Sequence, residues 1–74
     1  MSEGIVKRSV AIAGHQTSVS LEEPFWDELK RMAAERGMSV NGLIADIDAR
    51  RARTNLSSAI RLEILAALKQ RALS

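Results

Sequence analysis

Side chains that perform catalysis or hold metal ions are scarce in this sequence of 74 residues. It contains no cysteine and a single histidine, His15. Without cysteine there is no thiol nucleophile and no thiolate ligand for zinc, and a nucleophile paired with histidine could be built only on His15. Because His15 follows Gly14 and has no second catalytic group beside it, we expect it to be a turn or packing residue. The inventory therefore predicts no enzyme activity, no metal site and no cofactor.

Polar side chains that donate and accept hydrogen bonds recur at every second position of residues 15–21. This period of two predicts a strand with one buried face and one exposed face. The buried face would hold Thr17, Val19 and Leu21, and the exposed face Gln16, Ser18 and Ser20. The exposed side chains carry no charge, but each can form hydrogen bonds in both directions.

The preceding residues, 9–13, alternate in the same way, but their apolar positions are even-numbered, so the pattern breaks around Gly14. Two structures fit this break. A bulge at Gly14 would continue one long strand. Alternatively, a two-residue turn that begins with glycine would fold residues 9–13 back on 16–20 as a hairpin. In that hairpin Val10 would face Val19, and Ile12 would face Thr17.

Three helices are predicted after the strand. The first spans residues 23–36 and ends at Gly37, and Ser39 then caps a second helix from residue 40 to about 51. A third helix covers residues 55–73. Their apolar faces are formed by Phe25, Trp26, Leu29, Met32 and Ala33; by Val40, Leu43, Ile44 and Ile47; and by Ile60, Ile64, Leu65, Leu68 and Ala72.

Length and charge limit the classes of protein that fit. The chain is long enough for one domain with a small core, and two aromatic residues without a disulfide make oligomerisation the expected means of stabilising it. No apolar stretch reaches the length of a signal peptide or a membrane span, so we expect a cytoplasmic protein of bacterial type and no membrane partner. The net charge of +2 permits a nucleic-acid partner without requiring one.

The basic side chains lie near both ends of the sequence. Lys7 and Arg8 precede the strand, and Arg50, Arg51 and Arg53 follow the second helix. These cations could contact phosphates, but they could equally be solvated, and arginine also suits the negative end of the second helix dipole.

The order of strand, helix, glycine turn and helix resembles the ribbon-helix-helix fold of the Arc/MetJ/CopG superfamily over residues 16–51. The joint between the helices reads Gly37-Met38-Ser39-Val40-Asn41. More narrowly, the sequence resembles a family of short bacterial ribbon-helix-helix proteins in the segments 7–15, 17–22 and 55–59 and in the pair Phe25-Trp26. The resemblance implies a mainly α fold with one N-terminal β-strand, extended here by the third helix, in an intertwined homodimer.

In that fold one strand from each subunit pairs antiparallel and enters the DNA major groove. Carried over by position, the resemblance implies base contacts by Gln16, Ser18 and Ser20. It implies phosphate contacts around Ser39, Val40 and Asn41, and Lys7 and Arg8 are placed to reach flanking phosphates. The dimer core would consist of Val19, Leu21, Val40, Leu43, Ile44 and Ile47.

The function implied is sequence-specific binding of double-stranded DNA by a homodimer that regulates transcription. The alternative is a protein-interaction module, such as an antitoxin that binds its partner through the C-terminal helix, 55–73. If residues 9–13 form a hairpin with 16–20, the extra strand would crowd the groove, which accommodates two strands. The hairpin would then favour the interaction module.

Overall fold

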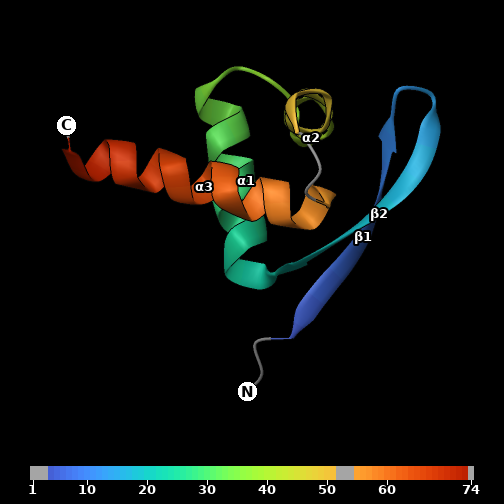
Figure 1. The fold of residues 1–74 in the computed structure, drawn as a ribbon, viewed down its shortest axis with the longest axis horizontal. Coiled ribbons are helices and arrows are strands. Elements are labelled where there is room, and N and C mark those ends of the chain that lie inside the picture. The colour runs from blue at the N-terminus through green and yellow to red at the C-terminus, as the bar shows by residue number, and fades with distance from the viewer. Residues whose placement is uncertain (1–3, 52–54, 74) are drawn as a thin grey trace.

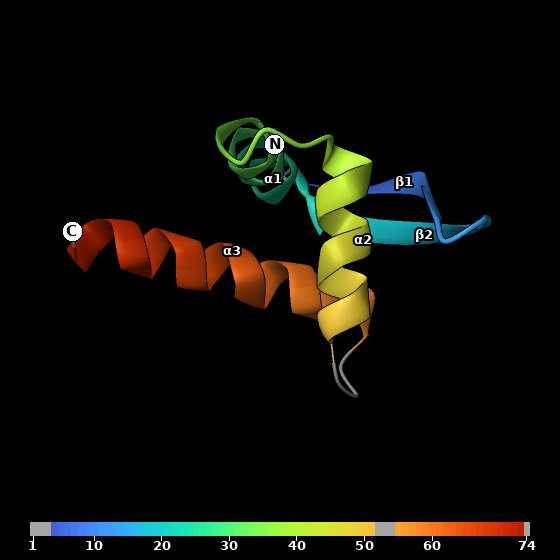
Figure 2. The same cartoon turned by 90° about the horizontal axis from the view of Figure 1, so that it is seen from above.

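The computed structural model describes residues 4–51 and 55–73. It contains the strands β1 (Ile5–Ile12) and β2 (His15–Glu22), followed by the helices α1 (Glu23–Glu35), α2 (Val40–Arg50) and α3 (Leu56–Leu73). The two strands form an antiparallel ribbon, and the helices gather on one side of it (Figure 1). The hairpin tip and the C-terminal half of α3 project in opposite directions from the centre of the molecule (Figure 2).

The hairpin is present, and its turn consists of Ala13 and Gly14. Both residues have positive φ, 50° and 85°, as a type I′ turn requires. Such a turn matches the right-handed twist of the paired strands, which explains why the chain folds back here although Ala13 is not glycine.

The register expected for the hairpin was wrong by two residues. The turn is Ala13-Gly14 and not Gly14-His15, so Val10 faces Thr17 and Ile12 faces His15. Because side chains alternate with a period of two, this displacement leaves every residue on the face that the alternation predicted. His15 is exposed at the end of the turn, as expected for a turn residue.

The helix boundaries agree with the predicted stop and start signals. At the end of α1, Gly37 has φ 67°, and the N–H groups of Gly37 and Met38 donate to the carbonyls of Ala34 and Ala33 at 3.1 and 2.9 Å. These two bonds form a Schellman motif. Ser39 then caps α2, because its Oγ accepts a hydrogen bond from the N–H of Gly42 at 2.9 Å.

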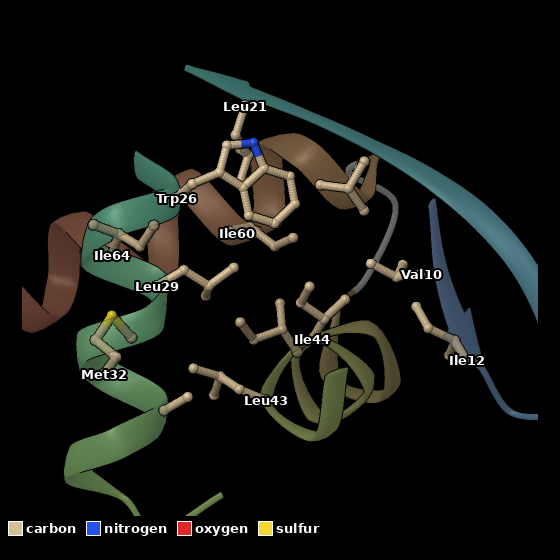
Figure 3. Packing of buried hydrophobic residues seen from close by; sticks show 13 residues of the cluster. Val10, Ile12, Leu21, Trp26, Leu29, Met32, Leu43, Ile44, Ile60 and Ile64 are labelled. Atoms are coloured by element: carbon tan, nitrogen blue, oxygen red, sulfur yellow. The ribbon is translucent and has the colours of Figure 1, made fainter. Parts of the chain in front are cut away.

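The core lies between the ribbon and the three helices (Figure 3). Trp26 fills its centre at 2% exposure, and its indole N–H donates to the carbonyl of Val6 at 2.9 Å, so the polar end of the ring is satisfied. The buried side chains are Val10, Ile12, Val19, Leu21, Trp26, Leu29, Met32, Ala33, Leu43, Ile44, Ile47, Ile60 and Ile64.

One predicted apolar face differs from the structure. Of the α3 residues expected on a single face, Ile60 and Ile64 are buried, whereas Leu65 and Leu68 are 51% and 37% exposed. The helix is apolar on two sides, and only one of them meets the core. Its C-terminal half still contacts α1, where Arg71 lies 3.8 Å from Glu35, but the leucines on the second side remain exposed.

Candidate nucleic-acid interface

The face of the ribbon that points away from the helices is polar and uncovered. Residues that face each other in an antiparallel pair project to the same side of the sheet. The register therefore brings six side chains from two strands onto this reading face: Lys7, Ser9 and Ala11 from β1, and Gln16, Ser18 and Ser20 from β2. All are exposed except Ser20, which is half-buried.

A hydrogen bond across the ribbon orients Gln16. The hydroxyl of Ser9 donates to Gln16 Oε1 at 2.8 Å. The amide NH₂ group of Gln16 then points away from Ser9, and both of its protons are available as donors. A glutamine held in this way presents a defined arrangement of donor and acceptor to whatever approaches the ribbon.

The contribution of β1 was missed by the sequence prediction, which named only Gln16, Ser18 and Ser20 as base-contacting residues. The hairpin adds Ser9 and Ala11, and it brings Lys7 beside Ser20 on the same face. The alternation in residues 9–13 carried this information, but it could be used only once the hairpin was chosen over the bulge.

The structure separates Lys7 from Arg8, which were expected to act together. Consecutive residues in a strand point to opposite faces, so Arg8 lies on the side of the helices. There its guanidinium stacks over Trp26, with Cζ 5.1 Å from the ring centroid. Lys7 alone belongs to the reading face.

The start of α2 offers free backbone donors. Ser39 Oγ accepts from Gly42 and the carbonyl of Ser39 accepts from Leu43, whereas the N–H groups of Val40 and Asn41 have no acceptor in the described residues. This end of α2 lies on the β1 side of the ribbon, and the opposite end lies on the β2 side (Figure 2). The α2 terminus expected to hold phosphate therefore flanks one edge of the ribbon.

The other edge of the ribbon adjoins the start of α3 (Figure 1). The N–H of Ser20 donates to Ser57 Oγ at 3.2 Å, and Arg61 Nη2 donates to the carbonyl of Ser20 at 3.3 Å. Arg61 also bonds Glu22 through Nε and Nη2 at 3.0 and 2.9 Å. The pKa of Glu22 is lowered, first by its backbone hydrogen bond and then by the bond from Arg61.

A polar cavity of about 480 Å³ opens beside these contacts. We call it the β2-edge cavity. Its polar lining includes Ser18, Ser20, Arg51, Ser57, Ser58 and Arg61. Thr17 and Ser18, which point to opposite faces of β2, both line it, so the cavity lies at the edge of the strand itself. No carboxylate is among its described lining residues.

Comparison with known proteins assigns the family of this chain. A family model described as the ribbon-helix-helix domain matches residues 5–68. The chain belongs to the ribbon-helix-helix domain family. Domains of this family are typically DNA-binding or regulatory and typically not enzymes.

The same ribbon-helix-helix arrangement occurs in a solved structure. An uncharacterized protein from Bordetella pertussis Tohama I is 34% identical in sequence, with a TM-score of 0.80 over 96% of this chain. This chain spans 61% of the length of that protein's chain. A comparison with curated proteins gives no match.

The ribbon of this ribbon-helix-helix domain is complete within one chain. β1 pairs with β2 along all eight of its residues, so one edge of β2 is occupied by the chain's own strand and the other edge is not paired with a strand of the described residues. The expected dimer-core residues are also buried within one chain, apart from the half-buried Val40. These residues therefore belong to the core of the single chain or, for Val40, pack against it. The full expected set was Val19, Leu21, Val40, Leu43, Ile44 and Ile47.

The arginines after α2 are engaged with carboxylates. Arg50 lies 3.0 Å from Asp46 and 3.3 Å from Glu63, and hydrogen bonds to Glu63 and then Asp46 raise its pKa. Arg51 bonds Asp48 at 2.6 Å. Arg53 lies outside the described residues.

Two other kinds of site do not occur in the described chain. Within residues 4–51 and 55–73, no cluster of three or more histidine or acidic side chains could hold a metal ion. Among the helices with described residues, none is sufficiently long and apolar to pass through a membrane.

Proposed function

We propose that this protein binds double-stranded DNA sequence-specifically by placing its own hairpin ribbon in the major groove, and that it regulates transcription in the bacterial cytoplasm. The observation that carries the proposal is the reading face: hydrogen-bonding side chains from two strands lie on one uncovered surface, directly opposite the buried core. Solubility alone requires only that the exposed face of a strand pair be polar. It does not require a lysine on that face, nor a glutamine that is held by a hydrogen bond from Ser9.

The dimensions of the ribbon suit the groove. Paired strands lie about 4.8 Å apart, and the major groove is about 12 Å wide and admits a two-stranded ribbon. The hairpin of one chain already provides these two strands. The crowding expected from an additional strand would arise only if two hairpins entered the same stretch of groove, so the hairpin does not count against DNA binding.

The side chains of the reading face match the base edges of the major groove. Gln16, oriented by Ser9, can form paired hydrogen bonds with adenine, and the hydroxyls of Ser18 and Ser20 can donate or accept at several bases. Lys7 can bond the acceptors of guanine, or a phosphate at the margin of the groove. The methyl group of Ala11 can contact a thymine methyl.

Phosphate contacts would position the ribbon along the groove. The N–H groups of Val40 and Asn41, which have no acceptor among the described residues, lie beside the capping residue Ser39 and form a helix N-terminus that favours an anion. Such contacts add affinity at any DNA sequence, whereas discrimination between sequences depends on the reading face.

We also propose that the protein acts as a homodimer, because ribbon-helix-helix domains usually dimerise. Two copies would place two hairpins on two half-sites of a roughly palindromic DNA sequence.

The test is fluorescence anisotropy with labelled duplexes from the upstream region of the gene, titrated at low and physiological salt. The proposal predicts binding that weakens as salt rises and that favours some duplexes over random DNA. Replacement of Gln16, Ser18 and Ser20 together by alanine should keep the thermal stability and abolish the preference. Equal affinity of the native protein for all duplexes would refute sequence-specific reading.

A second candidate function rests on the outer side of α3. Four leucines there remain exposed, by 59% at Leu62, 51% at Leu65, 37% at Leu68 and 84% at Leu73. Exposed apolar side chains that gather on one helix are typical of a surface that binds another protein. This observation favours an interaction module, such as an antitoxin that binds its partner through α3.

Substitution of Leu62 and Leu65 by glutamine distinguishes DNA binding from the interaction module. The double variant leaves the reading face intact, so its affinity for DNA should equal that of the native protein if α3 only supports the fold. If DNA binding is absent in the native protein, and co-expression with the product of a neighbouring gene yields a complex that the double variant loses, the interaction module is the function.

A further inference from the structure

The edge of β2 that β1 leaves free is closed at Ser20 and open at Gln16 and Ser18. In an antiparallel pair, alternate residues turn their N–H and C=O groups towards one neighbouring strand, and the residues between them turn theirs to the other edge. The N–H of Ser20 donates to Ser57 Oγ at 3.2 Å, so the even-numbered residues of β2 face the free edge. There the main-chain groups of Gln16 and Ser18 have no partner among the described residues.

Two side chains of α3 occupy both main-chain groups of Ser20. Ser57 accepts from its N–H, and Arg61 Nη2 donates to its carbonyl at 3.3 Å. Arg61 is itself fixed, because it also bonds the Glu22 carboxylate and its guanidinium stacks over Phe25, with Cζ 5.7 Å from the ring centroid. A strand that approaches this edge can therefore bond Ser20 only if α3 releases it.

Charge distinguishes the two edges of the ribbon. β1 carries Lys7 and Arg8, and two copies joined through β1 would bring the cations of both copies together, which disfavours such a pairing. Residues 15–20 of β2 contain no lysine, arginine or acidic side chain. The β2-edge cavity, which Thr17 and Ser18 help to line, leaves this stretch open to an approaching strand. A second copy of β2 is therefore the strand that fits the free edge.

The bonds to Ser20 restrict how two β2 strands can be aligned about a two-fold axis. Every antiparallel alignment with its axis at Ser18, or closer to α1, pairs Ser20 with a strand residue of the second copy. An axis at Thr17 instead pairs Gln16 with Ser18 and brings Gly14 of the turn opposite Ser20, where no strand bond is needed. Gly14 has open space around it, so the turn of the second copy fits beside α3.

We propose that Ser57 and Arg61 set the register of the homodimer. They hold Ser20, so that two β2 strands pair about a two-fold axis at Thr17. Both are positioning residues, because they act through the main chain of Ser20 and not by contacting DNA. This inference rests on the proposed homodimer and deepens it, by naming the strands that join the two copies and the residues that align them.

The register determines what the dimer presents to DNA. The paired stretch covers residues 15–19 of each copy, and beyond it each hairpin continues alone. Within this stretch the two β2 strands are central and the β1 strands lie outside them. Each Gln16 then lies beside the Ser18 of the other copy, on one continuous reading face that neither chain has alone.

Single cysteines report the register directly, because the native chain has no cysteine that could form another disulfide. With the axis at Thr17, the two Thr17 residues form a pair without mutual hydrogen bonds, whose Cα atoms lie about 4.5 Å apart, within the range that a disulfide bridges. The two Ser18 Cα atoms would lie about 8 Å apart, beyond that range. Under mild oxidation Thr17→Cys should therefore give a linked dimer on a non-reducing gel, and Ser18→Cys should not.

Ser57→Ala removes the acceptor from the N–H of Ser20 and tests whether this contact sets the register. The released strand can move its axis to Ser18 and gain hydrogen bonds at Ser20, so the linked fraction of Ser18→Cys should rise about tenfold in this background. Ser57→Thr keeps the hydroxyl and should retain the native result. The matched control is Ser58→Ala, because the Ser58 hydroxyl makes no hydrogen bond in the described residues.

Arg61→Gln releases the carbonyl of Ser20 and should raise the linked fraction of Ser18→Cys further when it is added to Ser57→Ala. Its control is Lys69→Gln, which changes the net charge equally at an exposed position that forms no ion pair in the described residues. Circular dichroism shows whether each variant is folded. If Arg61→Gln unfolds the chain, the comparison of Ser57→Ala with Ser58→Ala decides the question.

The outcomes separate this inference from the proposed function. A native dimer that is linked by Ser18→Cys, or by neither cysteine, would overturn the register, and linked fractions that Ser57→Ala leaves unchanged would overturn the role of α3. DNA binding would stand in each case. A native protein that is monomeric by size-exclusion chromatography with light scattering would refute the homodimer and this inference with it, whereas anisotropy decides DNA binding independently.

Discussion

The turn at Ala13-Gly14 brings β1 onto the reading face beside β2. Substitutions at Ala13 test this turn, because their effect on stability has one sign in a hairpin and the opposite sign in a bulged strand. Ala13 has φ 50°, in the left-handed region that costs an L-residue other than glycine about 1–2 kcal/mol. Asparagine tolerates this region and is the preferred first residue of a type I′ turn before glycine. We therefore expect Ala13→Asn to raise the free energy of unfolding by about 1 kcal/mol.

In a domain of this size, a change of about 1 kcal/mol corresponds to a rise in Tm of roughly 4–8 °C. Valine is β-branched and fits the left-handed region worse than alanine does, so Ala13→Val should lower the stability by about 1 kcal/mol or more. Ala13 is exposed at the hairpin tip, and the adjoining Gly14 has open space around it, so steric contacts do not complicate the comparison. Thermal unfolding followed by circular dichroism measures both.

The opposite order would refute the hairpin. If residues 9–22 formed one long strand with a bulge at Gly14, Ala13 would be extended, valine would be favoured there and asparagine disfavoured. A variant Ala13→Val that melts above the native protein, together with Ala13→Asn that melts below it, would remove β1 from the reading face.

Three further predictions concern the core and the contacts around the ribbon. Leu43→Asp places an unpaired carboxylate where the native side chain is fully buried. The expected loss of stability, about 4 kcal/mol or more, is most of the free energy of unfolding of a small domain. Circular dichroism at room temperature should therefore show a largely unfolded chain. Trp26→Phe removes the hydrogen bond to the carbonyl of Val6, and denaturant unfolding should show a loss of about 1–2 kcal/mol; an unchanged midpoint would contradict the role given to the indole. The lowered pKa of Glu22 stabilises the folded state above the ordinary value of 4.5, and this contribution is lost as pH falls through the lowered pKa. Glu22→Gln should therefore melt lower than the native protein at neutral pH, and the two Tm values should converge in acid. A constant difference would show that the charge of the Glu22 carboxylate, held by its backbone hydrogen bond and by Arg61, does not stabilise the fold.

The helices could be predicted from the sequence because their ends are marked by local chemistry. Gly37 terminates α1, and Ser39 caps α2 through hydrogen bonds between residues close together in the chain, so the residue types alone identify them. The alternation from Gln16 to Leu21 likewise placed these six side chains on the correct faces of β2. These signals depend on neighbours in the sequence and not on the tertiary structure.

The features that sequence reasoning missed depend on pairings between distant residues or on small energy differences. The hairpin register depended on whether Ala13 would accept a positive φ, which its residue type disfavours. The contact of Arg61 with Ser20 joins residues 41 positions apart, and no periodic pattern in the sequence predicts it. In α3 apolar residues occupy two sides of the helix, so the pattern could not tell which of them would meet the core.

Discrimination between DNA sequences by the reading face is measured by comparing two proteins on two duplexes. The native protein and the variant with alanine at positions 16, 18 and 20 are titrated against a duplex selected from the upstream region and against a random duplex, at physiological salt. We expect the native protein to prefer the selected duplex by about 10-fold or more, and the variant to bind both duplexes equally with unchanged Tm. A variant that keeps the full preference would contradict the proposed mechanism, because discrimination would then lie outside the ribbon.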